Sequence, residues 1–267
     1  MAFFLLAVNA LIMLLLPVGL GIWLAARWRA PWRLFGIGAT TFVLSQVGHI
    51  PFNGWVLNPR VQAFLGTEPA AAGFGRILLV ALLFGLSAGL FEETARYLVY
   101  RFWIPEARTW RDGMMFGAGH GGLEAIILGA LALQSLANIY LIHTGQAGQL
   151  VTPEQADQLA AAQTQVAALL NGPWYNLLVG GIERSLTVCT HLALALLVLQ
   201  TFVRGRWYWL AAAIGWHMLS NTVAVMGSLL GWTPLGVEGA LSLVALGSLA
   251  IIRGLYQPLP QPTESDA

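Results

Sequence analysis

Apolar stretches follow one another along almost the whole chain, separated by more polar connections. A transmembrane helix needs about 20 mainly apolar residues. We therefore predict an all-α, polytopic bundle of about seven transmembrane helices at 3–25, 33–57, 76–100, 113–142, 174–203, 207–230 and 235–252. The first stretch is expected to be a retained span, because it has no basic leader and is too long for the core of a signal peptide.

Arginines in the connections predict how this bundle is oriented, because cytoplasmic loops of membrane proteins carry an excess of basic residues. All 13 basic residues are arginine, and nine of them follow the first, third, fifth and seventh predicted spans. These nine are Arg27, Arg29, Arg33, Arg101, Arg108, Arg111, Arg204, Arg206 and Arg253. We therefore expect the N-terminus outside and the C-terminus in the cytoplasm.

Two polar segments lie outside the predicted spans. In the 143–173 connection, Thr152 can cap a short external helix, with Pro153 at its first position and Gln155 completing a capping box. Segment 257–267 is polar and rich in proline, so we expect it to be disordered. The remainder, 1–256, is expected to be a single transmembrane domain with a catalytic-type core at about 76–230.

Composition supports a lipid-facing protein. The chain is 57% hydrophobic and only 9% charged, whereas a soluble domain has about 25% charged residues. A net charge of +1 gives no indication of a nucleic acid partner. The single cysteine, Cys189, lies inside an apolar segment, which excludes a disulfide framework and a cysteine-based metal site.

Ionisable residues inside the predicted spans are the strongest functional signal. Placing Asp or Arg at the centre of a transmembrane helix costs about 2.5–3.5 kcal/mol on insertion scales. Internal salt bridges explain a single pair equally well, but polar contacts between transmembrane helices return only about 0.6 kcal/mol each on average. We therefore assign a function to the set as a whole: Glu92, Glu93, Arg96, His120, Glu124, Glu183, Arg184, His191, His217 and Asn221.

Spacing and depth predict that these residues meet at one site. Glu92 and Arg96 are four residues apart and share a helix face, and the same spacing relates His120 to Glu124 and His217 to Asn221. At ~1.5 Å per residue, Glu92, His120 and His217 each lie ~12–15 Å below the cytoplasmic surface. His191 is a little deeper, so four spans bring polar groups to about one level.

Glycines surround His120 at positions 117, 119, 121 and 122. Each weakens a helix by about 0.8–1 kcal/mol relative to alanine. Four such glycines around one histidine therefore require a structural or functional explanation. Close helix packing is one reason, with Gly117 and Gly121 as a small-xxx-small pair. Space for a substrate or a bend beside His120 is the other, and both remain open.

Carboxylate and imidazole groups suit the activation of water. In one version a glutamate takes the proton, histidines shuttle it, and Asn221 donates a hydrogen bond to the developing charge. In the other, His120, His191 and His217 bind Zn²⁺ and Glu92 is the base. The sequence leaves both versions open.

Two rival classes use similar residues. A proton- or ion-coupled transporter also needs buried Glu, His and Arg side chains, although the lack of a detectable internal repeat argues against it. A membrane scaffold or sensor without chemistry is the third class.

A family resemblance favours the enzyme. The pattern Glu92-Glu93-x-x-Arg96, Phe116-x-x-x-His120 and His217-x-x-x-Asn221 resembles the motif set of the CAAX-protease and bacteriocin-processing superfamily of intramembrane peptidases. The strings GHGGLEAIILG at 119–129 and ERSLTVCTH at 183–191 look more particularly like the YhfC family of membrane peptidases. The resemblance covers roughly 90–225.

The resemblance implies an endopeptidase in a bacterial cell membrane that cleaves a membrane protein, a lipidated protein or a peptide near the cytoplasmic leaflet. It implies that Glu92 activates water, that His120 assists, and that His217 and Asn221 form the oxyanion hole. Glu124, Glu183 and Arg184 are expected to support these residues.

The chain departs from the CAAX-type pattern in the acidic motif. That pattern usually has three residues between the second glutamate and the arginine, whereas this chain has two, as in the PrsW-type relatives. The difference leaves open whether Glu92 or Glu93 faces the site. His191 has no counterpart in the core CAAX motif, and it keeps Zn²⁺ open as a cofactor.

Three further ionisable residues are expected to lie outside the site. His49 is expected to make a hydrogen bond within the bundle. His143 is expected to be solvated, and Glu238 to reach the outer membrane surface from a helix end.

Overall fold

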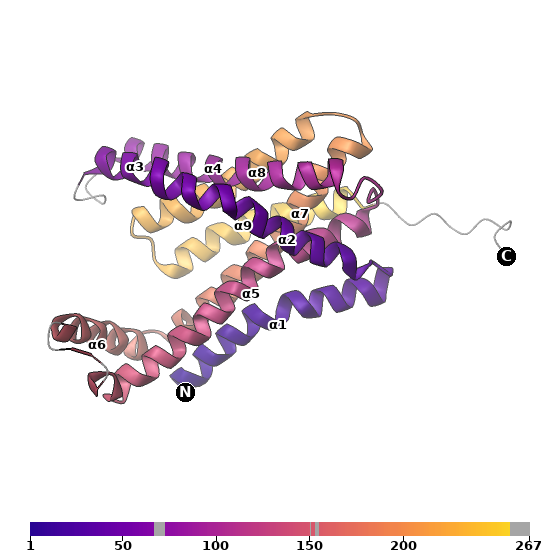
Figure 1. The fold of residues 1–267 in the computed structure, drawn as a ribbon. Helices are drawn as coiled ribbons and strands as arrows, with labels where there is room; N and C mark the ends of the chain where they lie inside the picture. The colour runs from indigo at the N-terminus through magenta and orange to yellow at the C-terminus, as the bar shows by residue number, and fades with distance from the viewer. Residues whose placement is uncertain (67–72, 150, 153–154, 257–267) are drawn as a thin grey trace.

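The chain folds into a bundle of long helices (Figure 1). The structure, a computed structural model, describes residues 1–66, 73–149, 151–152 and 155–256, and in these ranges it contains helices and no strand. The elements, in chain order, are α1 (Ala2–Trp28), α2 (Trp32–Pro51), the π-helix η1 (Phe52–Leu57), α3 (Asn58–Leu65), α4 (Phe74–Phe102), α5 (Trp110–His143), the short 3₁₀ helix η3 (Gln146–Gln149), α6 (Ala156–Asn171), the 3₁₀ turn η5 (Trp174–Leu178), α7 (Val179–Val203), α8 (Tyr208–Leu229) and α9 (Pro234–Gly254).

Six of these helices are long and apolar enough to cross a membrane: α1, α4, α5, η5 with α7, α8 and α9. Each matches a predicted span to within about three residues at either end. The predicted span at 33–57 corresponds to α2 and η1, and α2 is not among the six. The all-α membrane fold is therefore confirmed, while the count of seven spans remains a prediction.

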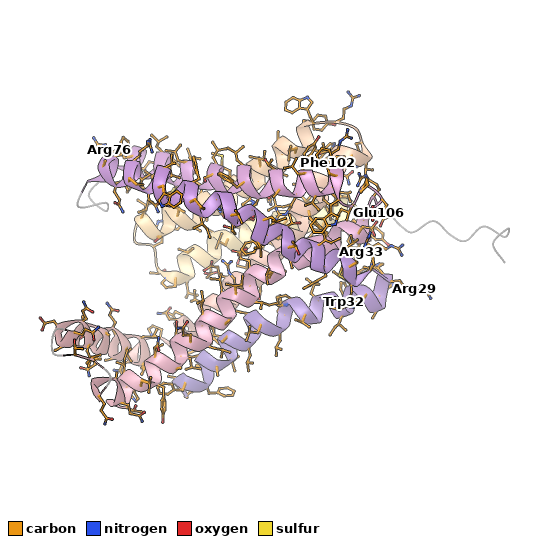
Figure 2. The ribbon with its side chains drawn as sticks, viewed as in Figure 1. Arg29, Trp32, Arg33, Arg76, Phe102 and Glu106 are labelled. Carbon is orange, nitrogen blue, oxygen red and sulfur yellow. The ribbon has the colours of Figure 1, made fainter. Side chains whose placement is uncertain are left out.

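The ends of the bundle separate the arginines as the charge pattern predicts. In Figure 2, Arg29, Arg33, Phe102 and Glu106 lie at one end of the bundle and Arg76 lies at the other. Arg33, near the start of α2, forms an ion pair with Glu106 in the connection between α4 and α5. Which end faces the cytoplasm remains a prediction.

An apolar core occupies the arginine-rich end. Tyr100 near the end of α4, Ile104 just after α4 and Phe116 in α5 are fully buried and belong to one cluster with residues of α7. Trp110, at the start of α5, closes this end by donating a hydrogen bond to the carbonyl of Ile252 in α9. The polar residues of the predicted site lie next to this core, nearer the middle of the helices.

Glycines let α5 approach its neighbours closely. A Cβ atom added at Gly119 would collide with the backbone of Phe35 in α2. On the opposite side of α5, a Cβ at Gly117 would lie 2.9 Å from the carbonyl oxygen of His191 in α7, and one at Gly121 would lie 2.7 Å from the His191 Cβ. The glycines around His120 therefore support the packing interpretation.

The segment between α5 and α7 contains the predicted external helix, but it starts later than expected. Helix α6 begins at Ala156, with Gln155 before it. The Gln155 side chain accepts a hydrogen bond from the backbone N–H of Thr152, at 3.1 Å, which is one of the two bonds of the predicted capping box, but the N-cap residue is Gln155 and not Thr152. Pro153, and the tail at 257–267 that was predicted to be disordered, lie outside the described residues.

Candidate metal and catalytic centre

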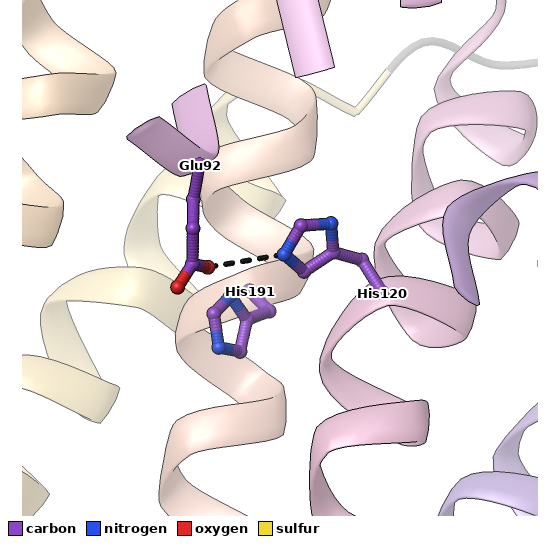
Figure 3. A group of neighbouring side chains, drawn as sticks. All are labelled: Glu92, His120 and His191. Carbon is purple, nitrogen blue, oxygen red and sulfur yellow. Dashed lines mark hydrogen bonds and ion pairs between the residues drawn. The ribbon is translucent and has the colours of Figure 1, made fainter. Parts of the chain in front are cut away.

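Four helices bring one carboxylate and three imidazoles together inside the bundle. Glu92 comes from α4, His120 from α5, His191 from α7 and His217 from α8, and none is more than 6% exposed. The ring centres of His120 and His191 are 5.4 Å apart, and those of His191 and His217 are 5.6 Å apart. Figure 3 shows the Glu92 carboxylate and the His120 ring pointing toward one another, with His191 beside them.

The two oxygens of Glu92 have different partners. Oε2 lies 3.0 Å from His120 Nε2, which donates to it. Oε1 accepts a hydrogen bond from Gln46 Nε2 in α2, at 3.1 Å. The Arg96 guanidinium is farther away, at 3.8 Å from Oε2. Glu92 is thus the member of the acidic pair that faces His120 and His191.

Glu93 has a different environment. It is fully buried and forms an ion pair with Arg96, which is also fully buried. His217 donates from Nδ1 to Glu93 Oε1 at 2.7 Å. The other nitrogen of this ring, Nε2, lies 4.0 Å from Glu92 Oε2. Glu93 therefore orients the His217 ring, and the ring presents a free nitrogen toward Glu92.

His191 lies between two charged groups. Arg96 Nη2 donates to its Nδ1 at 2.7 Å, and its Nε2 donates to Glu124 Oε2 at 2.8 Å. Glu124 in turn accepts from Arg184 Nη1 at 2.7 Å, and Arg184 also pairs with Glu183. The predicted supporting residues thus form one continuous polar network with the site.

The charges of this network are not balanced by its own residues. The network contains four carboxylates, Glu92, Glu93, Glu124 and Glu183, and two arginines, Arg96 and Arg184. With all carboxylates ionised and the histidines neutral, the net charge is minus two. Uncompensated charge is costly away from water, so the site favours a divalent cation or protonated histidines.

One group of side chains has the composition of a metal site. Glu92, His120 and His191 each offer a ligand atom, and these atoms all lie within 4.8 Å of one another. Two histidines and one glutamate are a ligand set that catalytic zinc uses, with a fourth position left for water. Glu124, bonded to His191 Nε2, supplies the second carboxylate that commonly orients a zinc-bound histidine.

The arrangement fits a metal with one adjustment. Arg96 occupies His191 Nδ1, so this side chain has to withdraw when that nitrogen binds a metal. The group also differs from the three-histidine site considered from the sequence. It contains Glu92 in place of His217, whose Nδ1 is held by Glu93 and whose Nε2 lies 4.0 Å from Glu92 Oε2.

Asn221 makes no hydrogen bond to this cluster in the part of the chain that the structure describes. It is half-buried in α8, one turn beyond His217, and none of the side-chain hydrogen bonds found among the described residues involves it. Its role in an oxyanion hole remains a prediction.

Of the residues predicted to lie outside the site, His49 makes bundle hydrogen bonds as expected, to Gln46 and Asn53, and His143 is exposed. The prediction for Glu238 was wrong. It is only 5% exposed, and its Oε2 is buried without a hydrogen-bond partner among the described residues. A helix-end position did not carry its carboxylate to the surface, because α9 packs this face against α7 and α8.

Sequence reasoning missed Gln46, which contacts Glu92 directly. Its signal was an amide in a predicted span, three residues before His49. A neutral amide in a span indicates a functional site less strongly than a charged side chain does. Gln46 Nε2 also lies 3.2 Å from Ser45 Oγ.

Ser45 lines a mainly apolar pocket of about 460 Å³ between α2 and α4, together with residues such as Gly48, Phe52 and Phe91.

Comparison with known proteins agrees with this geometry. The model of the family described as YhfC intramembrane metalloprotease matches residues 12–234, a range that includes every predicted site residue. The uncharacterized membrane protein YhfC of Bacillus subtilis (strain 168) is 37% identical over 224 residues, which cover 83% of each chain. No solved structure matches the chain. The apolar helices and this relative identify a multi-pass membrane protein of bacterial type, and the chain belongs to the YhfC intramembrane metalloprotease family.

Proposed function

We propose that this protein is a zinc-dependent endopeptidase that hydrolyses a peptide bond within the membrane, with Glu92, His120 and His191 as the metal ligands. The observation that carries the proposal is the meeting of these three side chains, from three helices, with their ligand atoms within 4.8 Å of one another. The net charge of minus two over the surrounding network supports a divalent ion, which would neutralise it.

Zinc bound at this position would acidify water and polarise the carbonyl group of the substrate. The residues of the chain handle the protons. His217 Nε2 is free and lies 4.0 Å from Glu92 Oε2, so a water molecule between these atoms can give its proton to His217. Glu93 keeps the ring in the tautomer that accepts this proton, because it binds the Nδ1–H group.

Hydrolysis of the peptide bond proceeds in two steps. The oxygen of the water attacks the carbonyl carbon of the peptide while its proton passes to His217 Nε2. When the C–N bond breaks, His217 returns the proton to the leaving nitrogen. The products are a carboxylic acid and an amine, which exchange a proton to give carboxylate and ammonium groups, and His217 is again neutral.

The depth of the site supports a substrate that lies in the membrane. Glu92 lies ten residues before the end of α4, and His120 lies ten residues after the start of α5. At ~1.5 Å per residue, the site is ~15 Å from the arginine-rich end of the bundle. A membrane protein, a lipidated protein or a membrane-bound peptide can present a bond at this depth, and the arginine pattern favours the cytoplasmic leaflet.

Family membership favours this enzyme over the proton- or ion-coupled transporter that the sequence also allowed. A further argument comes from the ion pairs. Arg96 and Arg184 hold three of the carboxylates in close pairs, which suits a fixed, preorganised site.

The proposal is tested by measuring zinc and cleavage in the same variants. Purified full-length protein in detergent is analysed for bound zinc, and cleavage is followed on a panel of membrane-embedded reporter peptides. We expect about one zinc per chain in the wild type and in His217→Ala, and none in Glu92→Gln or His191→Ala. Cleavage should be lost in all three variants.

Other outcomes would contradict the proposal in different ways. Cleavage by zinc-free protein would support the metal-free version, in which Glu92 itself takes the proton. Loss of zinc in His217→Ala would support the three-histidine site. Ion uptake by vesicles containing the protein, lost in Glu124→Gln, would support the transporter.

A further inference from the structure

A chain of four side chains leads from the middle of α4 through η1 and α2 back to Glu92. Ser87 Oγ donates to Asn53 Oδ1 at 2.8 Å, and Asn53 Nδ2 donates to His49 Nε2 at 2.9 Å. His49 Nδ1 lies 3.3 Å from Gln46 Oε1, and Gln46 Nε2 lies 3.1 Å from Glu92 Oε1. The chain therefore begins and ends on α4 and crosses to the neighbouring helix in between.

Each bond in this chain fixes the direction of the next. Asn53 accepts through Oδ1, so its amide nitrogen faces His49 and makes His49 Nε2 an acceptor. The proton of a neutral His49 is then on Nδ1, which donates to Gln46 Oε1. Gln46 must therefore present its NH₂ group, and not its oxygen, to Glu92. Every donor in the chain points toward the Glu92 carboxylate.

Local packing holds the chain in place. The His49 ring stacks on Phe91, with ring centres 5.5 Å apart and planes 25° apart. Phe91 fits against Gly48, where an added Cβ would lie 2.9 Å from its ring. Asn53 lies in the π-helix η1, and such departures from the α-helix are frequent at functional sites.

We propose that Gln46 is a positioning residue for the metal site: by holding Glu92 Oε1, it leaves Oε2 as the single oxygen that faces His120 and His191. This inference rests on the proposed zinc site. Outer partners that orient a metal ligand typically change metal affinity or activity by about 10–100-fold when they are removed. His49, Asn53 and Ser87 act through Gln46 by fixing the direction of its amide.

The test compares Gln46→Leu with Thr41→Val in full-length protein. Thr41 is a matched control, because it is fully buried on the same helix and its hydroxyl bonds only to Ile37 of its own helix. Zinc affinity is measured by competition with a chelator, and the visible spectrum of Co²⁺-loaded protein reports the ligand geometry. Gln46→Leu should bind zinc about 10–100-fold more weakly, with an altered Co²⁺ spectrum. Thr41→Val should match the wild type in both measurements.

Two further variants separate orientation from packing. Gln46→Met keeps the approximate size of the side chain but has no donor for Glu92, so it should weaken zinc binding about as much as Gln46→Leu. Ser87→Ala removes the first donor of the chain, far from the metal ligands, and should give a smaller loss of affinity in the same direction. Both variants remain informative if Gln46→Leu fails to fold.

The outcomes distinguish this inference from the proposed function. Wild-type affinity and an unchanged Co²⁺ spectrum in Gln46→Leu and Gln46→Met would overturn the role of Gln46 and leave the zinc site intact. Wild-type protein that binds no zinc would overturn both proposals.

Discussion

Gly121 controls the position of His191, and its replacement by alanine should disable the metal site. The added Cβ would lie 2.7 Å from both the Cβ and the Cδ2 of His191. Carbon atoms in good contact are about 3.5–4.0 Å apart, so α5 and α7 would have to separate locally by about 1 Å. The Cβ of His191 is tied to the backbone of α7, and a rotation of the ring cannot relieve this contact.

The expected effect on zinc binding is large, while the effect on stability is small. Metal–ligand distances tolerate changes of only about 0.2 Å, so a displacement of about 1 Å should weaken zinc binding by well over 10-fold. Overpacking costs about 1–3 kcal/mol, but replacing a helical glycine by alanine returns about 0.8–1 kcal/mol. The free energy of unfolding should therefore fall by at most about 2 kcal/mol.

The assay is chelator competition for zinc, together with thermal unfolding of the metal-free protein in detergent. Gly215→Ala is the matched control, because this helical glycine in α8 has nothing within 4 Å of an added Cβ. The control should bind zinc like the wild type. If Gly121→Ala binds zinc with wild-type affinity, either His191 is not a ligand or the two helices separate without moving it, and the reasoning from close packing fails.

Three further predictions follow from the ion pairs. Glu124→Gln should weaken zinc binding about 10–100-fold while the protein stays folded, because Glu124 orients His191; unchanged zinc affinity by chelator competition would contradict this. Glu93→Gln should lower the free energy of unfolding by about 3–5 kcal/mol, since it breaks a fully buried pair with Arg96; an unfolding titration that matches the wild type would refute it. Arg33→Gln should leave the unfolding temperature unchanged, because Arg33 and Glu106 are 63% and 56% exposed; a clear drop would show that this pair matters more than exposed pairs usually do.

The sequence predicted the helices well, because a helix that crosses the bilayer requires a long apolar segment and the chain has few other segments of that kind. The exception is α2, which was predicted as part of a span but is not among the six helices apolar enough to cross a membrane; it contains the polar residues Ser45, Gln46 and His49. Those residues are polar because they form the hydrogen-bond chain to Glu92. The ambiguous span is thus part of the site.

The sequence also indicated which residues would gather, because ionisable groups in apolar segments are costly. It left open which of Glu92 and Glu93 faces His120 and His191. Neighbouring residues on a helix point in directions about 100° apart, and only the packing of α4 against α5 and α8 decides between them. The same limit left open that the group able to hold a metal contains Glu92 in place of His217, since three histidines at a similar depth looked equivalent.

Neutral and buried groups were the hardest to predict. Gln46 carries no charge, and nothing in its spacing relates it to Glu92, 46 residues away. Glu238 was expected near the surface because it lies close to a helix start, but the neighbouring helices bury it. The contact of Gln46 with Glu92 and the burial of Glu238 both depend on how helices from distant parts of the sequence pack together.

The central claim is that Glu92, His120 and His191 bind one metal ion. Anomalous scattering at the zinc absorption edge, from crystals of the zinc-loaded protein, tests it most directly. The account predicts a single peak within about 2.0–2.2 Å of a Glu92 oxygen and of one nitrogen from each of His120 and His191. A peak bound to His217 in place of Glu92, or no peak among these helices, would contradict it.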